Sequence, residues 1–343
     1  MNISNDSYAI LLLCSDLGIG NLNDGVKPFT TSQWSNLAKK LIDAKLTPKS
    51  LLELSSDGLK EKLILSSEEI NRIDILRSRG GVFAIELSEL NEKGILTLTR
   101  ADKNYPIKLK DKLRNLAPPV IYYAGSLKLL ENRSISIVGS RNIDEIGEVF
   151  TEQLSKKCTN DGLNIISGGA RGVDTIAENV ANDSEGTTII VVSSDMQKKI
   201  RNKATRNAII NKQSLIISAV RPDRHFSAYL AMERNKYIYA LSDFAVVISS
   251  DYNKGGTWSG AKENLKRGLV PLFVRKDNSK LPKGNTELLK EAGVRPLTKD
   301  IIKQDKNIFE VLQKKSETMY KASKNEQTSL FDSLNNIKKK ATD

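Results

Sequence analysis

The residues best suited to chemistry lie in the stretch IISGGARGVDTIAENVA, at positions 165–181. An apolar run enters Gly168 and Gly169, Arg171 follows, and a helical pattern begins after Gly172. Glycines let a backbone approach a ligand closely, and the start of a helix presents unpaired N–H groups. Together with the donors of an arginine, these features are typical of phosphate binding. The alternative is a tight turn with Arg171 in solvent, and this loop by itself leaves both interpretations open.

Several classes of site are excluded by the residue types. The glycines do not follow G-x-G-x-x-G, and no Lys-Ser or Lys-Thr pair follows them, so neither a dinucleotide fingerprint nor a Walker A loop is present. The chain has one histidine, His225, and its two cysteines, Cys14 and Cys158, lie far apart. Metal-ligand clusters are therefore missing. We expect no metal and no cofactor.

Further polar and glycine-containing loops follow the apolar runs of the same region. Gly139, Ser140 and Arg141 follow SISIV, and Lys254, Gly255, Gly256 and Thr257 follow FAVVISSDYN. Arg234, Asn235 and Lys236 lie in MERNKYIYALSD, just before FAVVIS. Loops at the carboxyl ends of parallel strands share one edge of the sheet, so we expect these loops to converge on a ligand site.

Net positive charge points to a polyanionic partner. The 53 lysines and arginines exceed the 41 acidic residues, for a net charge of +12. Between two predicted strands, DMQKKIRNKATRNAIINK carries Lys198, Lys199, Arg201, Lys203 and Arg206. Such a run is usually a solvated face, but beside a phosphate-binding edge it is suited to following a nucleic-acid backbone.

The elements that must position these loops predict an α/β fold. From about residue 94, β-branched apolar runs alternate with helical patterns, which indicates a Rossmann-like, doubly wound, mostly parallel sheet over 94–300. Residues 1–93 predict a small helical module of the SAM or helix-hairpin-helix kind, in which one helix starts after Ser66 and ends at Gly80 and Gly81. Residues 301–343 form a polar, Lys-rich tail. No apolar run is long enough to span a bilayer, and the N-terminus lacks the features of a signal peptide, so we expect a cytoplasmic protein.

Four segments carry a resemblance to a known family. They are SIVGSRN, IISGGARGVDTIAENVA, ERNKYIYALSDFAVVI and GGTWSGAKENLKRGLVPLFV, and in this order they resemble the DNA-processing protein A (DprA, or Smf) family over roughly residues 95–275. The chain departs from the family pattern at Glu178, where a histidine is common. It also carries KGGTWSGA in place of a Ser-Gly-Ser turn.

The resemblance implies a function in DNA recombination and DNA processing. Family members bind single-stranded DNA in the basic pocket of the Rossmann-like domain, protect the strand, help load a RecA-type recombinase and form dimers, without known catalysis. Whether the setting is transformation, general recombination or phage defence stays open. Carried over by motif, the pocket consists of Gly139, Ser140, Arg141, Ser167, Gly168, Gly169, Arg171, Arg234, Asn235 and Lys236.

A second interpretation comes from a different functional class. GGTWSGAKE also resembles the turn of nucleotide-binding relatives, in which Glu263 could polarise a ribosyl bond and Asp174 could contact ribose. This predicts a nucleotide sensor or a nucleotide phosphoribohydrolase, again with phage defence as one setting. A third interpretation is a scaffold whose loops merely turn. The steepness of the salt dependence of DNA binding separates these classes.

The tail contains a short motif that suggests one more partner. Gln327, Thr328, Ser329, Leu330 and Phe331 resemble the pentapeptide with which bacterial proteins dock on the replication sliding clamp. Two adjacent large apolar residues in a polar tail are suited to anchoring in a partner's pocket. The alternative is that they fold back on the chain's own core, and five residues do not decide between these possibilities.

Overall fold

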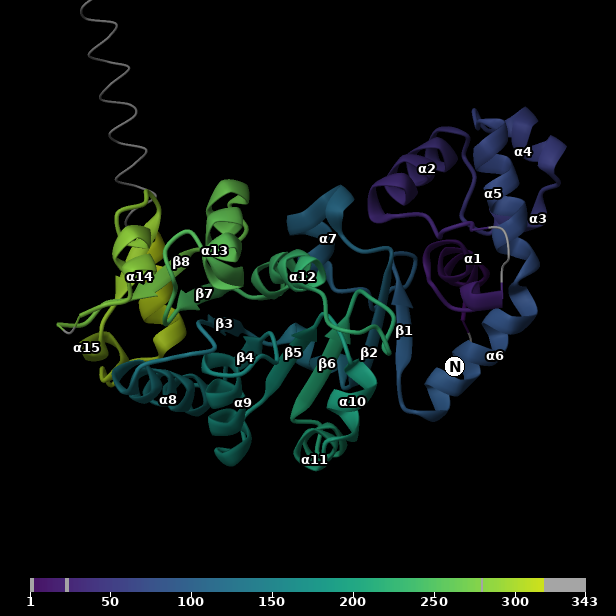
Figure 1. Ribbon diagram of the computed structural model, residues 1–343. Helices are drawn as coiled ribbons and strands as arrows, with labels where there is room; N and C mark the ends of the chain where they lie inside the picture. The colour runs from purple at the N-terminus through teal and green to yellow at the C-terminus, as the bar shows by residue number, and fades with distance from the viewer. Residues whose placement is uncertain (1–2, 22–24, 279, 318–343) are drawn as a thin grey trace, which may run out of the picture. The chain divides into compact units, whose positions relative to one another are not determined.

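The structure of this chain is a computed structural model that describes residues 3–21, 25–278 and 280–317 (Figure 1). The chain forms two compact units, each assembled from segments that are separate in sequence. Unit 1 contains the described residues up to Asn132, together with Ile166–Gly169 and Thr187–Ser242. Unit 2 contains Arg133–Ile165, Ala170–Gly186 and the described residues from Asp243 onward.

Unit 1 begins with a series of helices that are set by local capping signals. Thr30 with Gln33, and Ser66 with Glu69, form reciprocal capping boxes at the starts of α2 and α5. The helical elements are α1 (Asn5–Cys14), η1 (Ile19–Asn21), α2 (Thr31–Asp43), α3 (Ser50–Glu53), α4 (Ser56–Lys62), α5 (Ser67–Ser78) and α6 (Gly80–Glu92).

The predicted helix between Ser66 and the Gly80-Gly81 pair is α5, which Ser66 caps and which ends at Ser78, and a second helix, α6, begins at Gly80 and continues to Glu92. The two helices are separated by Arg79, which is 3% exposed. Its guanidinium donates to the carbonyl oxygens of Leu12 and Leu17, and to that of Ser15 at 2.9 Å. Burial lowers the pKa of Arg79 to about 10. A tertiary contact that the local pattern does not contain therefore fixes this break.

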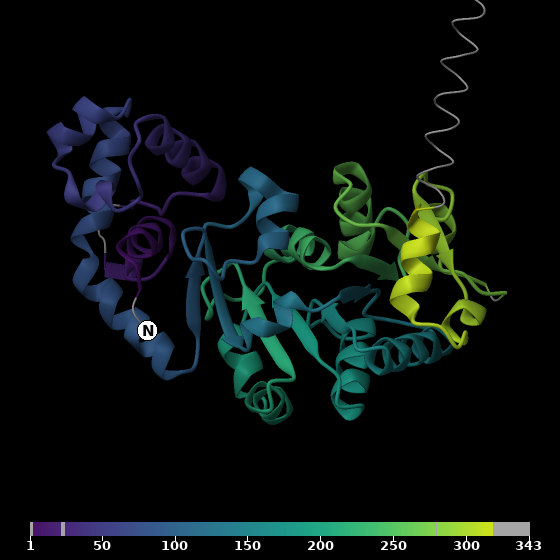
Figure 2. The same cartoon turned by 180° about the vertical axis from the view of Figure 1, so that it is seen from behind.

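The sheet of unit 1 has the strand order β1-β2-β6-β5. Its β1–β2 and β2–β6 pairs are antiparallel and its β5–β6 pair is parallel. Its elements are β1 (Leu96–Thr99), α7 (Ile107–Leu113), η2 (Arg114–Leu116), β2 (Val120–Gly125), η3 (Leu127–Glu131), β5 (Thr188–Val192), α10 (Met196–Arg201), α11 (Lys203–Ile210), β6 (Ser214–Ser218) and α12 (Ala228–Leu241). Figures 1 and 2 show α10 and α11 on one face of this sheet and α12 on the other.

One hydrophobic core joins the N-terminal helices to this sheet. Leu13 and Phe83 from the helices and Tyr122, Ile190 and Ile216 from the strands belong to the same buried cluster. The division of the chain at residues 93 and 300 stays a prediction, because the two units are interleaved in sequence.

Unit 2 contains a fully parallel set of strands in the order β3-β7-β8-β9. Its elements are β3 (Ser134–Val138), α8 (Glu145–Asn160), α9 (Val173–Asp183), β7 (Phe244–Val247), α13 (Gly255–Arg267), β8 (Leu272–Arg275), α14 (Lys283–Leu288), β9 (Val294–Leu297) and α15 (Lys299–Ile302). Helices α8 and α9 lie on one face of these strands and α13 on the other (Figure 1). Strand β4 (Asn164–Ser167) contributes its first two residues to unit 2 and its last two to unit 1.

The predicted fold class is confirmed, since the strands are mostly parallel, the sheet is mixed and helices cover it. Apolar β-branched strands such as β5, in which every residue is buried, account for this pattern. None of the helices in the described part of the chain has the length and apolar character needed to cross a membrane.

Candidate functional site

The tightest point of the glycine-rich turn in unit 2 is Gly172. It precedes α9 with φ 78° and ψ −128°, a conformation that residues with a side chain rarely adopt. A Cβ at this position would lie 2.4 Å from the carbonyl oxygen of Ser140 and 2.7 Å from that of Arg141. The start of α9 therefore packs directly against the backbone that carries the first predicted arginine.

The loops after β3 and β7 meet this turn. Ser140 N–H donates to the carbonyl oxygen of Ser249 at 2.9 Å, and Val173 N–H donates to that of Ser140 at 3.4 Å. A Cβ on Gly139 would stand 2.4 Å from a methyl carbon of Val173. In unit 2, the loops at the carboxyl ends of these two strands and the start of α9 thus form one continuous backbone surface.

This surface in unit 2 presents exposed cations. Arg141 and Arg171 are both exposed, and so is Lys254, the residue that precedes α13. Gly255 and Gly256 open α13 in exposed positions, and Thr257 after them is half-buried. The surface therefore combines exposed guanidinium groups with the first turn of a helix, which are groups that bind phosphate.

Asn285 fixes the loop that leads from β7 to α13. Its side-chain oxygen accepts a hydrogen bond from Ser250 N–H at 2.8 Å, and its amide nitrogen donates to the carbonyl oxygen of Ile248 at 2.9 Å. Asn285 is fully buried. Buried amide groups of this kind hold a loop in one conformation, because breaking either bond would leave a polar group unsatisfied.

Ser167, Gly168 and Gly169 lie in unit 1, where Arg234 contacts their turn. The guanidinium of Arg234, on α12, donates to the carbonyl oxygens of Gly168 and Val191. A Cβ on Gly168 would lie within 2.8 Å of this guanidinium. Arg234 is therefore a positioning residue for the turn, and its predicted contact with phosphate stays a prediction.

Lys236 and Asn235 are placed differently from the exposed arginines. Lys236 is 8% exposed, and its ammonium forms an ion pair with Glu233 at 2.5 Å. Asn235 is half-buried. The i,i+3 spacing of Glu233 and Lys236 on a helix was a signal in the sequence for this pairing. Their assignment to phosphate binding also stays a prediction, and the geometry gives it less support than it gives to Arg141 and Arg171.

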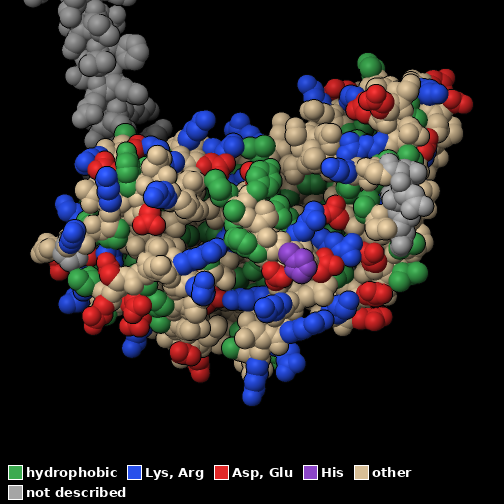
Figure 3. Space-filling view, in the orientation of Figure 1, with side chains coloured by type: hydrophobic (Ala, Val, Ile, Leu, Met, Phe, Trp, Pro, Cys, Tyr) green, Lys and Arg blue, Asp and Glu red, His purple; other side chains and the backbone are tan. Residues whose placement is uncertain are grey.

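The predicted basic run forms α10 and α11 in unit 1. Lys198, Arg201, Lys203 and Arg206 are exposed there, and Lys199 is half-buried. The ammonium of Lys199 lies 3.8 Å from the point where a Cβ of residue 169 would stand. Figure 3 shows lysine and arginine side chains gathered over the part of the surface where Figure 1 places these two helices.

The carboxylates required by the nucleotide-hydrolysing interpretation are engaged within unit 2. Asp174 is 6% exposed and accepts a hydrogen bond from Ala170 N–H at 3.2 Å. Glu263 pairs with Arg267 at 2.8 Å, one turn further along α13. Each carboxylate therefore has a partner within unit 2. Among the described residues there is also no group of three histidine, cysteine or acidic side chains that could hold a metal ion.

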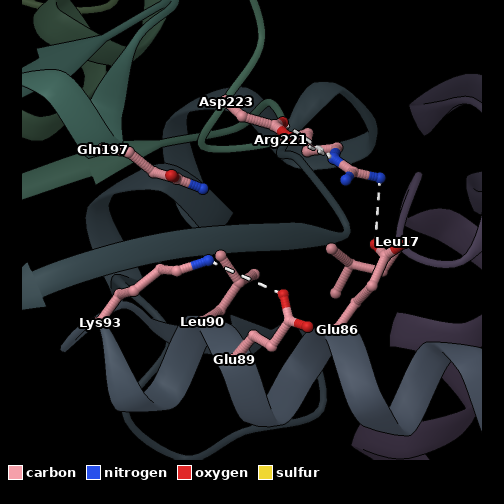
Figure 4. A pocket seen from close by; sticks show the side chains of 8 residues that line it. All are labelled: Leu17, Glu86, Glu89, Leu90, Lys93, Gln197, Arg221 and Asp223. Atoms are coloured by element: carbon pink, nitrogen blue, oxygen red, sulfur yellow. Dashed lines mark hydrogen bonds and ion pairs between the residues drawn. The ribbon is translucent and has the colours of Figure 1, made fainter.

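A small pocket in unit 1 is lined by paired charges rather than by unsatisfied ones (Figure 4). Its volume is about 160 Å³, and it lies between α6 and the loop that follows β6. Arg221 pairs with Glu86 at 3.1 Å and with Asp223 at 2.8 Å, and it donates to the carbonyl oxygen of Asp16 at 3.0 Å. We interpret these contacts as a link between the N-terminal helices and the sheet. The predicted clamp motif, Gln327, Ser329, Leu330 and Phe331, lies outside the described residues.

The sequence of this chain matches one protein family and several known proteins. Residues 96–306 match the family model for DNA recombination-mediator protein A. The chain is 28% identical to DNA processing protein DprA of Bacillus subtilis, over 53% of this chain and 61% of that protein. It is 31% identical to Protein Smf of Borreliella burgdorferi, over 54% and 60% respectively. The chain thus spans about three fifths of the length of these two relatives.

Two solved structures share the fold. The X-ray structure of DprA from Streptococcus pneumoniae aligns with a TM-score of 0.55 and 22% identity, covering 78% of this chain and 95% of that one. The structure of DNA processing protein A from Helicobacter pylori, described in connection with its single-stranded DNA binding mode, aligns with a TM-score of 0.51 and 25% identity. That alignment covers 66% of this chain and 96% of the Helicobacter pylori chain.

Proposed function

This chain belongs to the DNA recombination-mediator protein A family, as its motifs predicted, and from that membership we propose that it binds single-stranded DNA and acts in recombination without catalysing a reaction. The Helicobacter pylori relative, which is described as binding single-stranded DNA, supports this choice of ligand. The engagement of Asp174 and Glu263 in internal contacts supports a non-catalytic role.

The exposed arginines beside the tight turn carry the proposal. Gly172 leaves no room between the start of α9 and residues 140–141, so Arg141 projects from a backbone that is held in place. Arg171 is exposed within the same turn. Cations that are fixed in this way bind the phosphates of a strand and position it, but they do not distinguish bases. We therefore expect little sequence preference.

The remaining parts of the proposal follow from the family resemblance. Protection of the bound strand, loading of a RecA-type recombinase, formation of a homodimer and a cytoplasmic location belong to it. Docking of the tail on a sliding clamp is a separate proposal that rests on Gln327, Ser329, Leu330 and Phe331 alone. A synthetic peptide of residues 322–335 should bind purified clamp, and it should no longer bind when Leu330 and Phe331 are both changed to alanine.

The DNA-binding proposal is tested by titrating a labelled thymidine oligonucleotide and following its fluorescence anisotropy. Arg141→Ala and Arg171→Ala should each weaken binding by roughly 10–150-fold, since a hydrogen bond to a charged group contributes about 1.5–3 kcal/mol. Arg267→Ala is the matched control, because that exposed arginine is already paired with Glu263. Its affinity should match that of the wild type.

The salt dependence of binding separates a DNA strand from a single nucleotide. Each phosphate that the protein neutralises on single-stranded DNA lowers the slope of log K against log salt by about 0.7. A steep slope would support strand binding, whereas a shallow slope would indicate a mononucleotide site. Unchanged affinity in both the Arg141 and the Arg171 variants would refute the assignment of this surface.

A further inference from the structure

Helices α10 and α11 of unit 1 carry an unusual concentration of positive charge. Residues 196–212 include six lysines and arginines and no acidic residue. Five of the six side chains are exposed, and they are Lys198, Arg201, Lys203, Arg206 and Lys212. Like charges placed this close together repel one another, so the arrangement does not favour the folded state by itself.

Some cations on other helices of the chain pair with acidic side chains. Lys40 pairs with Glu69 at 3.0 Å in unit 1, and Lys262 pairs with Glu291 at 2.6 Å in unit 2. Within the part of the chain that the structure describes, none of the five exposed cations of 196–212 forms an ion pair. The charge on α10 and α11 therefore lacks a counter-charge from the described fold, which points to an external anion.

The two helices are mounted rigidly, with their apolar sides turned inward. Met196, Thr205 and Ala208 are buried, α10 packs against β6, and α11 packs against β2 and β6. Asn202 separates the helices and caps α11, since its side-chain oxygen accepts from Ala204 N–H at 3.0 Å and from Thr205 N–H at 3.2 Å. The cations consequently occupy the face that the core does not use.

Lys199 connects this basic face to the glycine-rich turn. Its half-buried ammonium lies beside Gly169, while its sequence neighbour Lys198 is exposed on the same helix. A polyanion that reaches Gly169 would therefore meet Lys199 first and then the exposed cations of α10 and α11.

We propose that the exposed cations of α10 and α11 form a second phosphate-binding surface, which continues the path of a single DNA strand away from Gly169. The inference rests on the proposed function and deepens it, because it assigns a longer footprint to the same ligand. An acidic membrane would attract the same charges, but a helix that lies in a membrane interface inserts its apolar face. Here that face is buried against the sheet, so the geometry favours a nucleic-acid backbone.

The test measures the binding of a short and a long DNA strand to the wild-type protein and to one variant. In the variant Lys198→Gln, Arg201→Gln, Lys203→Gln and Arg206→Gln, all four changes are at exposed positions. They should leave the circular dichroism spectrum unchanged and should not lower the melting temperature, since they remove mutual repulsion. A strand of about six thymidines should occupy the glycine turn only, and a strand of about thirty should reach both surfaces. The variant should bind the short strand as the wild type does. For the long strand, its salt slope should be shallower by about 0.7 for each phosphate that the variant no longer neutralises.

A second variant controls for the change in net charge. Lys39→Gln, Lys49→Gln, Lys60→Gln and Lys62→Gln remove four exposed charges from the N-terminal helices. This variant should bind both strands as the wild type does. An equal decrease in affinity in both variants would overturn the proposal, as would wild-type binding of the long strand by the α10–α11 variant.

Two further outcomes distinguish this proposal from membrane binding and from a failure of the proposed function. If the α10–α11 variant no longer binds phosphatidylserine vesicles and retains its DNA affinity, the surface serves a membrane and the proposal is overturned. If the wild-type protein binds neither strand, the proposed function itself is refuted, and this extension falls with it.

Discussion

Replacing Gly172 by alanine should lower both the stability of unit 2 and its affinity for DNA. Gly172 has φ 78°, and an alanine Cβ would stand 2.4 Å from the carbonyl oxygen of Ser140. Two penalties follow, because the backbone conformation is unfavourable for alanine and the new methyl group overlaps the backbone of the neighbouring loop.

The size of the effect follows from these two penalties. Holding a non-glycine residue in such a conformation costs about 1–3 kcal/mol, and overpacking adds about 1–3 kcal/mol when neighbours cannot move freely. We expect the free energy of unfolding to fall by about 2–6 kcal/mol. Ordinary van der Waals distances are restored only if the backbone at residues 140–141 moves by about 1 Å. Arg141 then leaves its position, and DNA affinity should fall by roughly 10–150-fold.

Gly162→Ala provides the matched control in the same unit. Gly162 follows α8 with φ 74°, and a Cβ there would meet no atom within 4 Å. This variant should lose about 1–2 kcal/mol of stability from the backbone conformation alone, with DNA binding intact. Urea denaturation followed by circular dichroism gives the stabilities, and anisotropy under conditions where each variant is folded gives the affinities. Wild-type affinity in folded Gly172→Ala, or an equal decrease in affinity in Gly162→Ala, would refute the reasoning.

Two further predictions concern ion pairs. Asp144 caps α8 and accepts a hydrogen bond from Arg275, and that hydrogen bond holds the pKa of the Asp144 carboxyl below its usual value. The ionised carboxyl should therefore stabilise the fold at neutral pH, and this stabilisation should be lost as the pH falls through the folded-state pKa. Asp144→Asn should therefore lower the free energy of unfolding by at most about 1 kcal/mol at pH 7, because the Asp144 side chain is 45% exposed. Urea titrations should show that this difference from the wild type vanishes in acid. A constant difference at every pH would contradict the prediction. Arg221→Ala should destabilise unit 1 by about 1.5–3 kcal/mol, because its side chain is mostly buried among its partners. Arg224→Ala should cost under about 1 kcal/mol, since its pair with Asp16 is exposed, and equal destabilisation in these two variants would contradict the role assigned to Arg221.

The fold class was predictable because its signals are local. Strand β5 is an uninterrupted β-branched run, and both β5 and β6 are buried along their whole length. The cap at Ser66 marks a helix start in the sequence itself. The buried position of Arg79 between α5 and α6 was not predictable in the same way. Its partners, the carbonyl oxygens at residues 12, 15 and 17, lie more than sixty positions away in the chain. The glycine pair beside it predicted the end of α5 to within two residues, but it did not show that a second helix, α6, begins there.

The candidate site was predictable in its residue types but not in how each side chain is used. Arg141, Arg171 and Arg234 are indistinguishable as motif residues, yet only the first two are exposed. Arg234 donates to the carbonyl oxygens of Gly168 and Val191, which are separated from it by 66 and 43 positions. No sequence pattern announces a contact of that kind. The partner of Lys236, by contrast, lies three residues away and could have been found.

Cations that already serve partners inside the protein should contribute less to DNA affinity than cations that are exposed. A cation that already serves a carbonyl or a carboxylate must give up that partner before it can neutralise a phosphate, so it adds little to the salt dependence. Arg234 and Lys236 are engaged in this way, whereas the five exposed cations of residues 196–212 form no ion pair within the described part of the chain. Counting the motif residues would assign the whole salt slope to the glycine turn. Our proposal instead attributes much of it to α10 and α11, and it therefore predicts that strand length, rather than the motif alone, governs the affinity.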